Sequence, residues 1–256
     1  MGKHLDKAIL PEHYENYIFD LYGTLVDIHT DETEPVVWQK LALFFGYYGA
    51  HYEPEELQAR YAGIVKELES LQKKTLEADR KDAHESSPEI EITKVFMQLY
   101  QEKGIRPDES LAVYTGQIFR ILTTEYVRLY PGTKEMLSHL KELGKNIYLL
   151  SNAQRIFTAY EMNDLGIREF FDDILISSDY QTKKPDERFF GILMQRHSLE
   201  GEQSLFVGND SKCDIMGARH AGMDTFYVYS NISPENDAAE DANYIVNKFT
   251  TWEVRA

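Results

Sequence analysis

Short apolar segments that end in polar or glycine-containing turns recur along this chain and alternate with amphipathic stretches of helical period. Strands buried on both faces of a parallel sheet have this length and composition. The alternation predicts right-handed βαβ crossovers and an α/β fold with a doubly wound, Rossmann-like parallel sheet. The predicted strands are Tyr17–Phe19, Asn146–Leu150, Asp173–Ile176, Ser204–Val207 and Thr225–Tyr229. The predicted helices between them are Thr133–Leu143, Ile156–Leu165, Asp186–His197 and Asp214–Ala221.

The alternation is interrupted between about residues 30 and 130, where no segment resembles a strand. Apolar residues there recur at helical spacing instead, as they do from Leu57 to Leu71. The charged segment from Lys73 to Glu85 has no apolar periodicity, and we expect a solvated loop there. We therefore predict a core domain made of residues 1–29 and 131–256, with a helical cap domain made of residues 30–130.

The size and charge of the chain restrict what it can bind. Its 256 residues, 43% of them hydrophobic, are enough for the buried core of a globular enzyme. The 27 basic and 43 acidic side chains give a formal net charge of −16, which repels nucleic acid and anionic membranes and favours small molecules or proteins as partners. A single cysteine, Cys213, cannot form an intrachain disulfide, and no N-terminal stretch resembles a signal peptide, so we expect a cytoplasmic location.

Polar side chains follow four of the predicted strands, near the point where each strand ends. Because the carboxyl ends of parallel strands meet at one edge of a sheet, where open α/β sheets place their ligand sites, we expect these side chains to form one site. The segments are Asp20-Leu21-Tyr22-Gly23-Thr24, Ser151-Asn152, Lys184-Pro185-Asp186 and Gly208-Asn209-Asp210, the last with Asp214 four residues further on.

This order of segments resembles the four motifs of the haloacid dehalogenase-like (HAD) hydrolase superfamily. The resemblance extends from Tyr17 to about Val228, and the predicted helical insert resembles the cap that part of the superfamily carries after its first motif. It implies a hydrolase that works through a covalent aspartyl intermediate. For the phosphatases of the superfamily it further implies Mg²⁺ as cofactor and a small, anionic, phosphorylated substrate.

The resemblance also implies roles for individual residues. Asp20 would be the nucleophile, and Ser151 would bind the transferring group. Lys184 would keep Asp20 ionised and offset charge in the transition state. The further side chains expected to contact the substrate are Thr24, Asn152 and Tyr22.

A magnesium site follows from the same resemblance. Asp20, the main-chain carbonyl of Tyr22 and Asp210 would be ligands, and Asp214 would be a further ligand or a supporting partner. Mg²⁺ prefers oxygen donors and often binds through one or two carboxylates together with a substrate phosphate. A cation would also reduce the repulsion between neighbouring carboxylates.

Tyr22 departs from the phosphatase pattern, in which this position carries a second aspartate that acts as general acid and base. A positioned general acid is typically worth about 10² to 10⁴ in rate. The enzyme could hydrolyse phosphates whose leaving groups need little protonation, or take its acid from the cap.

Because of Tyr22, two alternatives to a phosphatase stay open, a dehalogenase and a binding protein. The 2-haloacid dehalogenases carry tyrosine at this position and need no metal, because halide leaves without a proton. A third possibility is a weakly active or inactive protein that keeps the fold for binding. Asp210 favours the magnesium-dependent phosphatase, because dehalogenases usually have serine and asparagine near this position.

Overall fold

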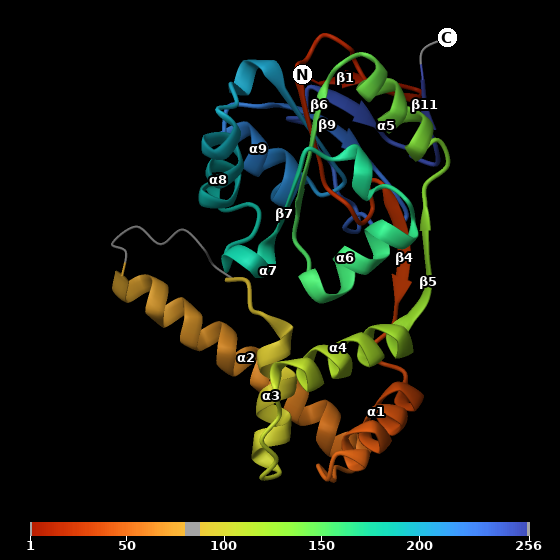
Figure 1. The fold of residues 1–256 in the computed structure, drawn as a ribbon. Helices are drawn as coiled ribbons and strands as arrows, with labels where there is room; N and C mark the ends of the chain where they lie inside the picture. Colours follow the sequence, from red (N-terminus) through yellow and green to blue (C-terminus); the bar gives the residue numbers. More distant parts are fainter. Residues whose placement is uncertain (1, 80–87, 255–256) are drawn as a thin grey trace. The chain divides into compact units, whose positions relative to one another are not determined.

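The computed structural model describes residues 2–79 and 88–254, which form two compact units (Figure 1). The second unit contains His29–Tyr126 and Gln154–Tyr160, and the remaining described residues form the first. The chain passes between the units within strands β4 (Val26–Thr30) and β5 (Thr124–Leu129), which pair with each other, and again at the two ends of Gln154–Tyr160. That these units act as a core domain and a cap domain stays a prediction.

A parallel sheet organises the first unit, as the sequence predicted. Within the described residues it has seven strands in the order β1-β10-β9-β8-β3-β6-β7. The sheet is extended from β3 on one side through β6 and β7 and on the other through β8, which is the doubly wound arrangement. The strands are β1 (Lys3–His4), β3 (Asn16–Phe19), β6 (Asn146–Ser151), β7 (Asp173–Ile176), β8 (Ser204–Gly208), β9 (Asp224–Val228) and β10 (Tyr244–Val246).

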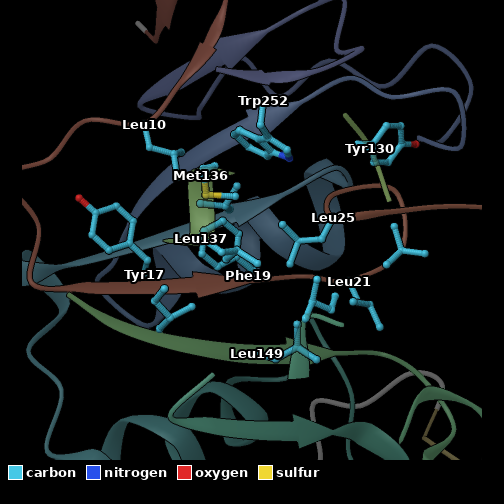
Figure 2. Packing of buried hydrophobic residues seen from close by; sticks show 14 of the residues in the cluster. Leu10, Tyr17, Phe19, Leu21, Leu25, Tyr130, Met136, Leu137, Leu149 and Trp252 are labelled. Atoms are coloured by element: carbon cyan, nitrogen blue, oxygen red, sulfur yellow. The ribbon is translucent and has the colours of Figure 1, made fainter. Parts of the chain in front are cut away.

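Strand β3 lies at the centre of this sheet, and its side chains alternate between two hydrophobic clusters. Tyr17 and Phe19 belong to the cluster that Figure 2 shows around Leu137 and Trp252. Ile18 belongs to a second cluster, which includes Phe190. Successive residues of a strand point to opposite faces, so both faces of the sheet are buried.

Helices of the first unit supply the other side of each cluster. Helix α5 (Thr133–Glu142) packs into the cluster of Phe19, and helices α8 (Glu187–His197) and α9 (Gly217–His220) pack into that of Ile18. The shorter elements are α7 (Ser177–Tyr180), the 3₁₀ turns Arg168–Phe170 and Gly201–Gln203, the π-helix Ser211–Met216, and strands β2 (Ala8–Ile9) and β11 (Trp252–Glu253), which pair with each other. Helix α6 (Arg155–Asp164) begins among residues of the second unit and ends in the first.

The second unit has a hydrophobic core of its own. Four helices surround a cluster of aromatic side chains in which Phe119 lies 5.2 Å from Tyr61, 5.6 Å from Trp38 and 5.8 Å from Phe96, measured between ring centroids. This confirms the expected helical insert. The helices are α1 (Pro35–Tyr47), α2 (Pro54–Asp79), α3 (Ile92–Glu102) and α4 (Glu109–Thr123).

Two details of the insert differ from the sequence prediction. The stretch from 73 to 79, expected to be a loop, continues helix α2, because lysine, leucine, glutamate and alanine favour a helix even without an apolar stripe. The rest of the expected loop, 80–85, lies outside the described residues. Strand β5 occupies a region where no strand was expected; its exposed and half-buried residues form a strand because β4 pairs with it. None of the described helices is long and apolar enough to cross a membrane.

Candidate active site

Strand register brings the predicted site residues to one edge of the sheet. Phe19, the last residue of β3, lies opposite Leu149 in β6 and Val207 in β8. Asp20 therefore leaves the sheet near the ends of both neighbouring strands, where Ser151 and Gly208 are found.

Asp20 is held by two donors on a single carboxylate oxygen. Lys184 Nζ donates to Asp20 Oδ1 at 2.7 Å, and Ser151 Oγ donates to the same oxygen at 3.0 Å. Within the described residues, every hydrogen bond found for this carboxylate goes to Oδ1. Oδ2 would therefore be the attacking oxygen if Asp20 is the nucleophile, a role that stays a prediction.

Lys184 lies between two aspartates and is almost completely buried. Its Nζ is 2.7 Å from Asp20 Oδ1 and 2.7 Å from Asp214 Oδ1. Burial alone would lower the pKa of this lysine, but the charges of Asp20 and Asp214 outweigh burial, and the net effect raises the pKa of Lys184. Burial raises the pKa of Asp214 to about 7, with Lys184 acting in the opposite direction and Asp20 adding to the rise.

Asp214 organises the turn that follows β8. Its Oδ2 accepts hydrogen bonds from the main-chain N–H groups of Asn209, at 2.9 Å, and Asp210, at 3.0 Å. Gly208 permits this close approach, because a Cβ there would lie 2.4 Å from Asp214 Oδ2. Both carboxylate oxygens of Asp214 thus have donors, which favours the supporting role over direct metal binding.

Asp210 caps the helix that follows it. Its Oδ1 accepts from the main-chain N–H groups of Lys212, at 2.9 Å, and Cys213, at 2.7 Å. The next residue, Ser211, donates its main-chain N–H to Asp237 Oδ2 at 2.7 Å. Its own helix and the loop around Asp237 therefore fix the position of the Asp210 carboxylate, while its role as metal ligand stays a prediction.

Asn152 connects the segment after β6 to the segment that carries Lys184. Its Nδ2 donates to the main-chain carbonyl of Lys184 at 2.9 Å, and its Oδ1 accepts from the main-chain N–H of Lys184 at 2.8 Å. The amide positions Lys184 through its backbone, a contact that sequence reasoning did not predict. Contact of Asn152 with a substrate stays a prediction.

Thr24 and Gly23 pack against Asn209, a residue that sequence analysis included in the fourth segment without a role. The Thr24 hydroxyl, which is fully buried, donates to Asn209 Oδ1 at 3.4 Å. Gly23 has a φ of 88°, and a Cβ there would lie 2.3 Å from Asn209 Nδ2. Asn209 therefore joins the first turn to the fourth, and the predicted contact of Thr24 with a substrate stays a prediction.

Tyr22 has a partner that the sequence analysis missed. Its hydroxyl donates to Glu161 Oε2 at 2.5 Å, and Glu161 is only 7% exposed. The signal was present in helix α6, where Thr158, Glu161 and Met162 have the spacing of one helix face and are all buried. A glutamate on such a face requires a polar partner, although the sequence does not identify Tyr22 as that partner.

The carboxylate oxygens at this edge of the sheet suit Mg²⁺ if waters and a phosphate supply its remaining ligands. Within residues 2–79 and 88–254, no three His, Cys, Asp or Glu side chains form a group that could hold a metal ion. Asp20 and Asp210 nevertheless offer carboxylates, and Mg²⁺ commonly takes one or two of these and completes its coordination with waters and phosphate oxygens. The residues therefore fit a magnesium ion shared with a substrate phosphate.

A doubly wound sheet with a nucleophile-like aspartate, a buried lysine and a hydroxyl at its carboxyl edge defines a hydrolase class. The haloacid dehalogenase-like hydrolase family model matches residues 14–222, so the chain belongs to that family.

Two curated relatives of this chain are phosphatases. A glyceraldehyde 3-phosphate phosphatase from Methanothermobacter thermautotrophicus is 30% identical over 166 residues, which are 59% of this chain and 74% of the relative. A phosphoglycolate phosphatase from Vibrio cholerae is 35% identical over 116 residues, or 44% of this chain and 51% of the relative. The match to the second thus spans about half the length of that protein.

Two solved structures share this fold. A magnesium-bound HAD hydrolase from Bacillus subtilis is 21% identical, with a TM-score of 0.51 over 93% of this chain and 96% of that one. A 2-haloacid dehalogenase from Pseudomonas syringae is 20% identical, with a TM-score of 0.60 over 91% of this chain and 94% of that one. These structures confirm the α/β fold with its helical insert.

Proposed function

We propose that this protein is a magnesium-dependent phosphatase that acts on a small phosphorylated metabolite through an aspartyl-phosphate intermediate. The observation that carries the proposal is the buried contact of Asp20 with Lys184 and Ser151, which holds one carboxylate oxygen and leaves the other to attack. Two relatives are phosphatases, which supports transfer of a phosphoryl group over release of a halide.

In the first half of the proposed reaction, Asp20 Oδ2 forms a bond to phosphorus while the bond from phosphorus to the leaving oxygen breaks. Lys184 and Ser151 lie beside the attacking carboxylate and can donate to oxygens on which negative charge develops. Mg²⁺ bound near Asp20 and Asp210, with the main-chain carbonyl of Tyr22 as a further ligand, would offset the charge of the phosphoryl group.

In the second half, water attacks the phosphorus of the aspartyl phosphate. The bond between phosphorus and Asp20 Oδ2 breaks, inorganic phosphate leaves, and the Asp20 carboxylate is restored. Lys184 keeps its contact with Asp20 Oδ1 and favours the departing carboxylate as an anion. Thr24 and Asn152, in addition to their contacts within the protein, are proposed to line the phosphate site, and residues 30–130 are proposed to act as the cap that selects the substrate.

A metal-independent 2-haloacid dehalogenase is the second candidate. The observation that favours it is Tyr22, which resembles the tyrosine of those enzymes. A non-catalytic binding protein is the third candidate, and it predicts no turnover of either substrate class.

A substrate panel separates the three. Purified protein is assayed on alkyl phosphates, acyl phosphates and 2-haloacids, each with Mg²⁺ and with a chelator. Phosphate release that requires Mg²⁺ is the expected result, and halide release that survives the chelator would establish the dehalogenase instead.

Asp20→Asn provides the matched control, because asparagine keeps the shape of the side chain and removes the nucleophilic oxygen. We expect it to abolish phosphate release and to leave the circular dichroism spectrum unchanged. Undiminished turnover by a folded Asp20→Asn protein would refute the assignment of the nucleophile.

A further inference from the structure

The contact between Tyr22 and Glu161 bears on which phosphates the proposed enzyme can hydrolyse. Tyr22 lies two residues after the nucleophile Asp20, and its ring packs, partly buried, against the hydrophobic cluster that contains Phe19. Its hydroxyl donates to Glu161 Oε2 at 2.5 Å. The side chain is therefore fixed at both ends, by the cluster along the ring and by the carboxylate at the hydroxyl.

A phenol has a single O–H proton, and here that proton is directed at a buried carboxylate. A hydrogen bond this short to a carboxylate oxygen inside the protein is costly to break, because the buried oxygen loses a donor. While the bond is in place, the Tyr22 hydroxyl does not deliver its proton to the oxygen of a leaving group.

We propose that Glu161 is a positioning residue that holds the Tyr22 hydroxyl, so that position 22 orients the substrate without protonating it. The inference rests on the phosphatase function proposed above. It assigns the substrate class: acyl phosphates and phosphates of acidic hydroxyls, whose leaving groups depart as stable anions. In the step itself, Asp20 Oδ2 bonds to phosphorus, and the leaving oxygen keeps the electron pair of its bond to phosphorus and takes no proton from the protein.

The dependence of rate on the leaving group tests this. The kcat/KM of the wild-type protein is measured with Mg²⁺ on acetyl phosphate, on glycerol phosphate and on a series of aryl phosphates whose phenols differ in acidity. We expect acetyl phosphate to exceed glycerol phosphate by at least about 100-fold, because a missing general acid costs about 10² to 10⁴ only where the leaving group needs a proton. A ratio near one would overturn the inference and leave the phosphatase function standing, whereas a lack of turnover on every phosphate overturns both.

Tyr22→Phe identifies the role of the hydroxyl. Loss of the anchored hydroxyl should lower kcat/KM by a similar factor for every member of the series, so that the slope of log(kcat/KM) against leaving-group pKa stays the same. A loss that is at least tenfold larger for glycerol phosphate than for acetyl phosphate would show that the hydroxyl is the acid, and would overturn the proposal.

Two substitutions of Glu161 test whether it acts through Tyr22. Glu161→Gln keeps an oxygen acceptor for the hydroxyl and should keep the wild-type ratio of acetyl phosphate to glycerol phosphate. Glu161→Leu removes this carboxylate acceptor and should lower that ratio several-fold. In a Tyr22→Phe background, Glu161→Leu should leave the ratio unchanged, since there is no hydroxyl to release.

Thermal unfolding and circular dichroism establish that each variant is folded. A change of ratio by Glu161→Leu that persists in the Tyr22→Phe background would indicate a structural effect of Glu161, and would overturn its role as a positioning residue. If Glu161→Leu does not fold, the Tyr22→Phe and Glu161→Gln results decide the question by themselves.

Discussion

The turn after Asp20 requires a glycine at position 23, because a side chain there would disturb the geometry of the site. The φ of Gly23, 88°, is unfavourable for any other residue by roughly 1–2 kcal/mol. A Cβ at this position would also lie 2.3 Å from the buried side chain of Asn209, which joins the turn after Asp20 to the turn after β8.

We expect Gly23→Ala to lower both the free energy of unfolding and kcat/KM, the latter by about tenfold or more, because displacement of the turn misplaces Asp20. Gly144→Ala is the matched control: Gly144 also has a positive φ, of 73°, but nothing lies within 4 Å of a Cβ there. It should show the backbone cost of roughly 1 kcal/mol with unchanged activity. Equal losses of activity in the two variants would contradict the role of the Gly23–Asn209 contact. Urea unfolding and steady-state kinetics provide both measurements.

Contacts between single residues could be predicted from the sequence only where the residues follow neighbouring strands of the sheet. The rule that parallel strands end at one edge was sufficient to predict that Asp20, Ser151 and Lys184 gather together, and their contacts agree with it. The partner of Tyr22 could not be predicted, because Glu161 reaches it from a helix whose rotation depends on packing. For the same reason, the hydrogen bonds of Asn152 to the backbone of Lys184 could not be predicted from their spacing.

Among the elements, the strands made mainly of buried residues were predictable, and the strands of two or three residues were not. Strands β3, β6, β7, β8 and β9 consist mainly of buried residues, so their composition alone indicates strands. Strands β1 and β10 have two or three residues, which is too few to show a period, and they exist because β9 offers an edge with which β10 can pair. Hydrogen bonding to a neighbour, rather than local preference, determines such segments.

The contacts between strand β7 and helix α8 should make the stability of the protein depend on pH. Asp173 Oδ2 lies 3.0 Å from Arg196 Nη1 and 2.8 Å from His197 Nε2, both in the last turn of α8. Burial alone would raise the pKa of Asp173, but its hydrogen bonds to His197, Arg196 and the main-chain N–H of Ile174 outweigh burial, and the pKa is lowered.

A carboxylate whose pKa is lowered by folding stabilises the protein above its ordinary pKa near 3.8, and this stability is lost as the pH falls through the folded-state value. We therefore expect Asp173→Asn to reduce the free energy of unfolding by about 1 kcal/mol at pH 7, a modest value because Arg196 is largely solvated. The difference from the wild type should shrink towards pH 3. Urea unfolding at both pH values measures it, with Asp6→Asn, at an exposed aspartate, as control. A difference that grows on acidification would contradict the assignment.

Over the whole molecule, the net charge of −16 acts against an anionic substrate. Long-range repulsion of this kind is screened by salt, since the Debye length falls from about 30 Å at 0.01 M to about 10 Å at 0.1 M ionic strength. We expect kcat/KM for a phosphate substrate to rise about two- to threefold over this range at constant free Mg²⁺, with kcat unchanged. Steady-state rates over a series of NaCl concentrations test this. A fall in kcat/KM with salt would mean that the local field of Lys184 and the metal governs the approach of the substrate.

The helical insert buries an aromatic cluster whose described members all belong to the insert, among them Phe45, Phe96 and Phe119. Among residues 2–79 and 88–254, the contacts that hold Asp20 and Lys184 come from the sheet-containing unit. Substitutions among the residues of this cluster are therefore expected to leave the contacts of Asp20 and Lys184 in place. If residues 30–130 select the substrate as proposed, a laboratory library restricted to residues 30–123 is expected to change which phosphate is hydrolysed and to leave the contacts of Asp20 in place.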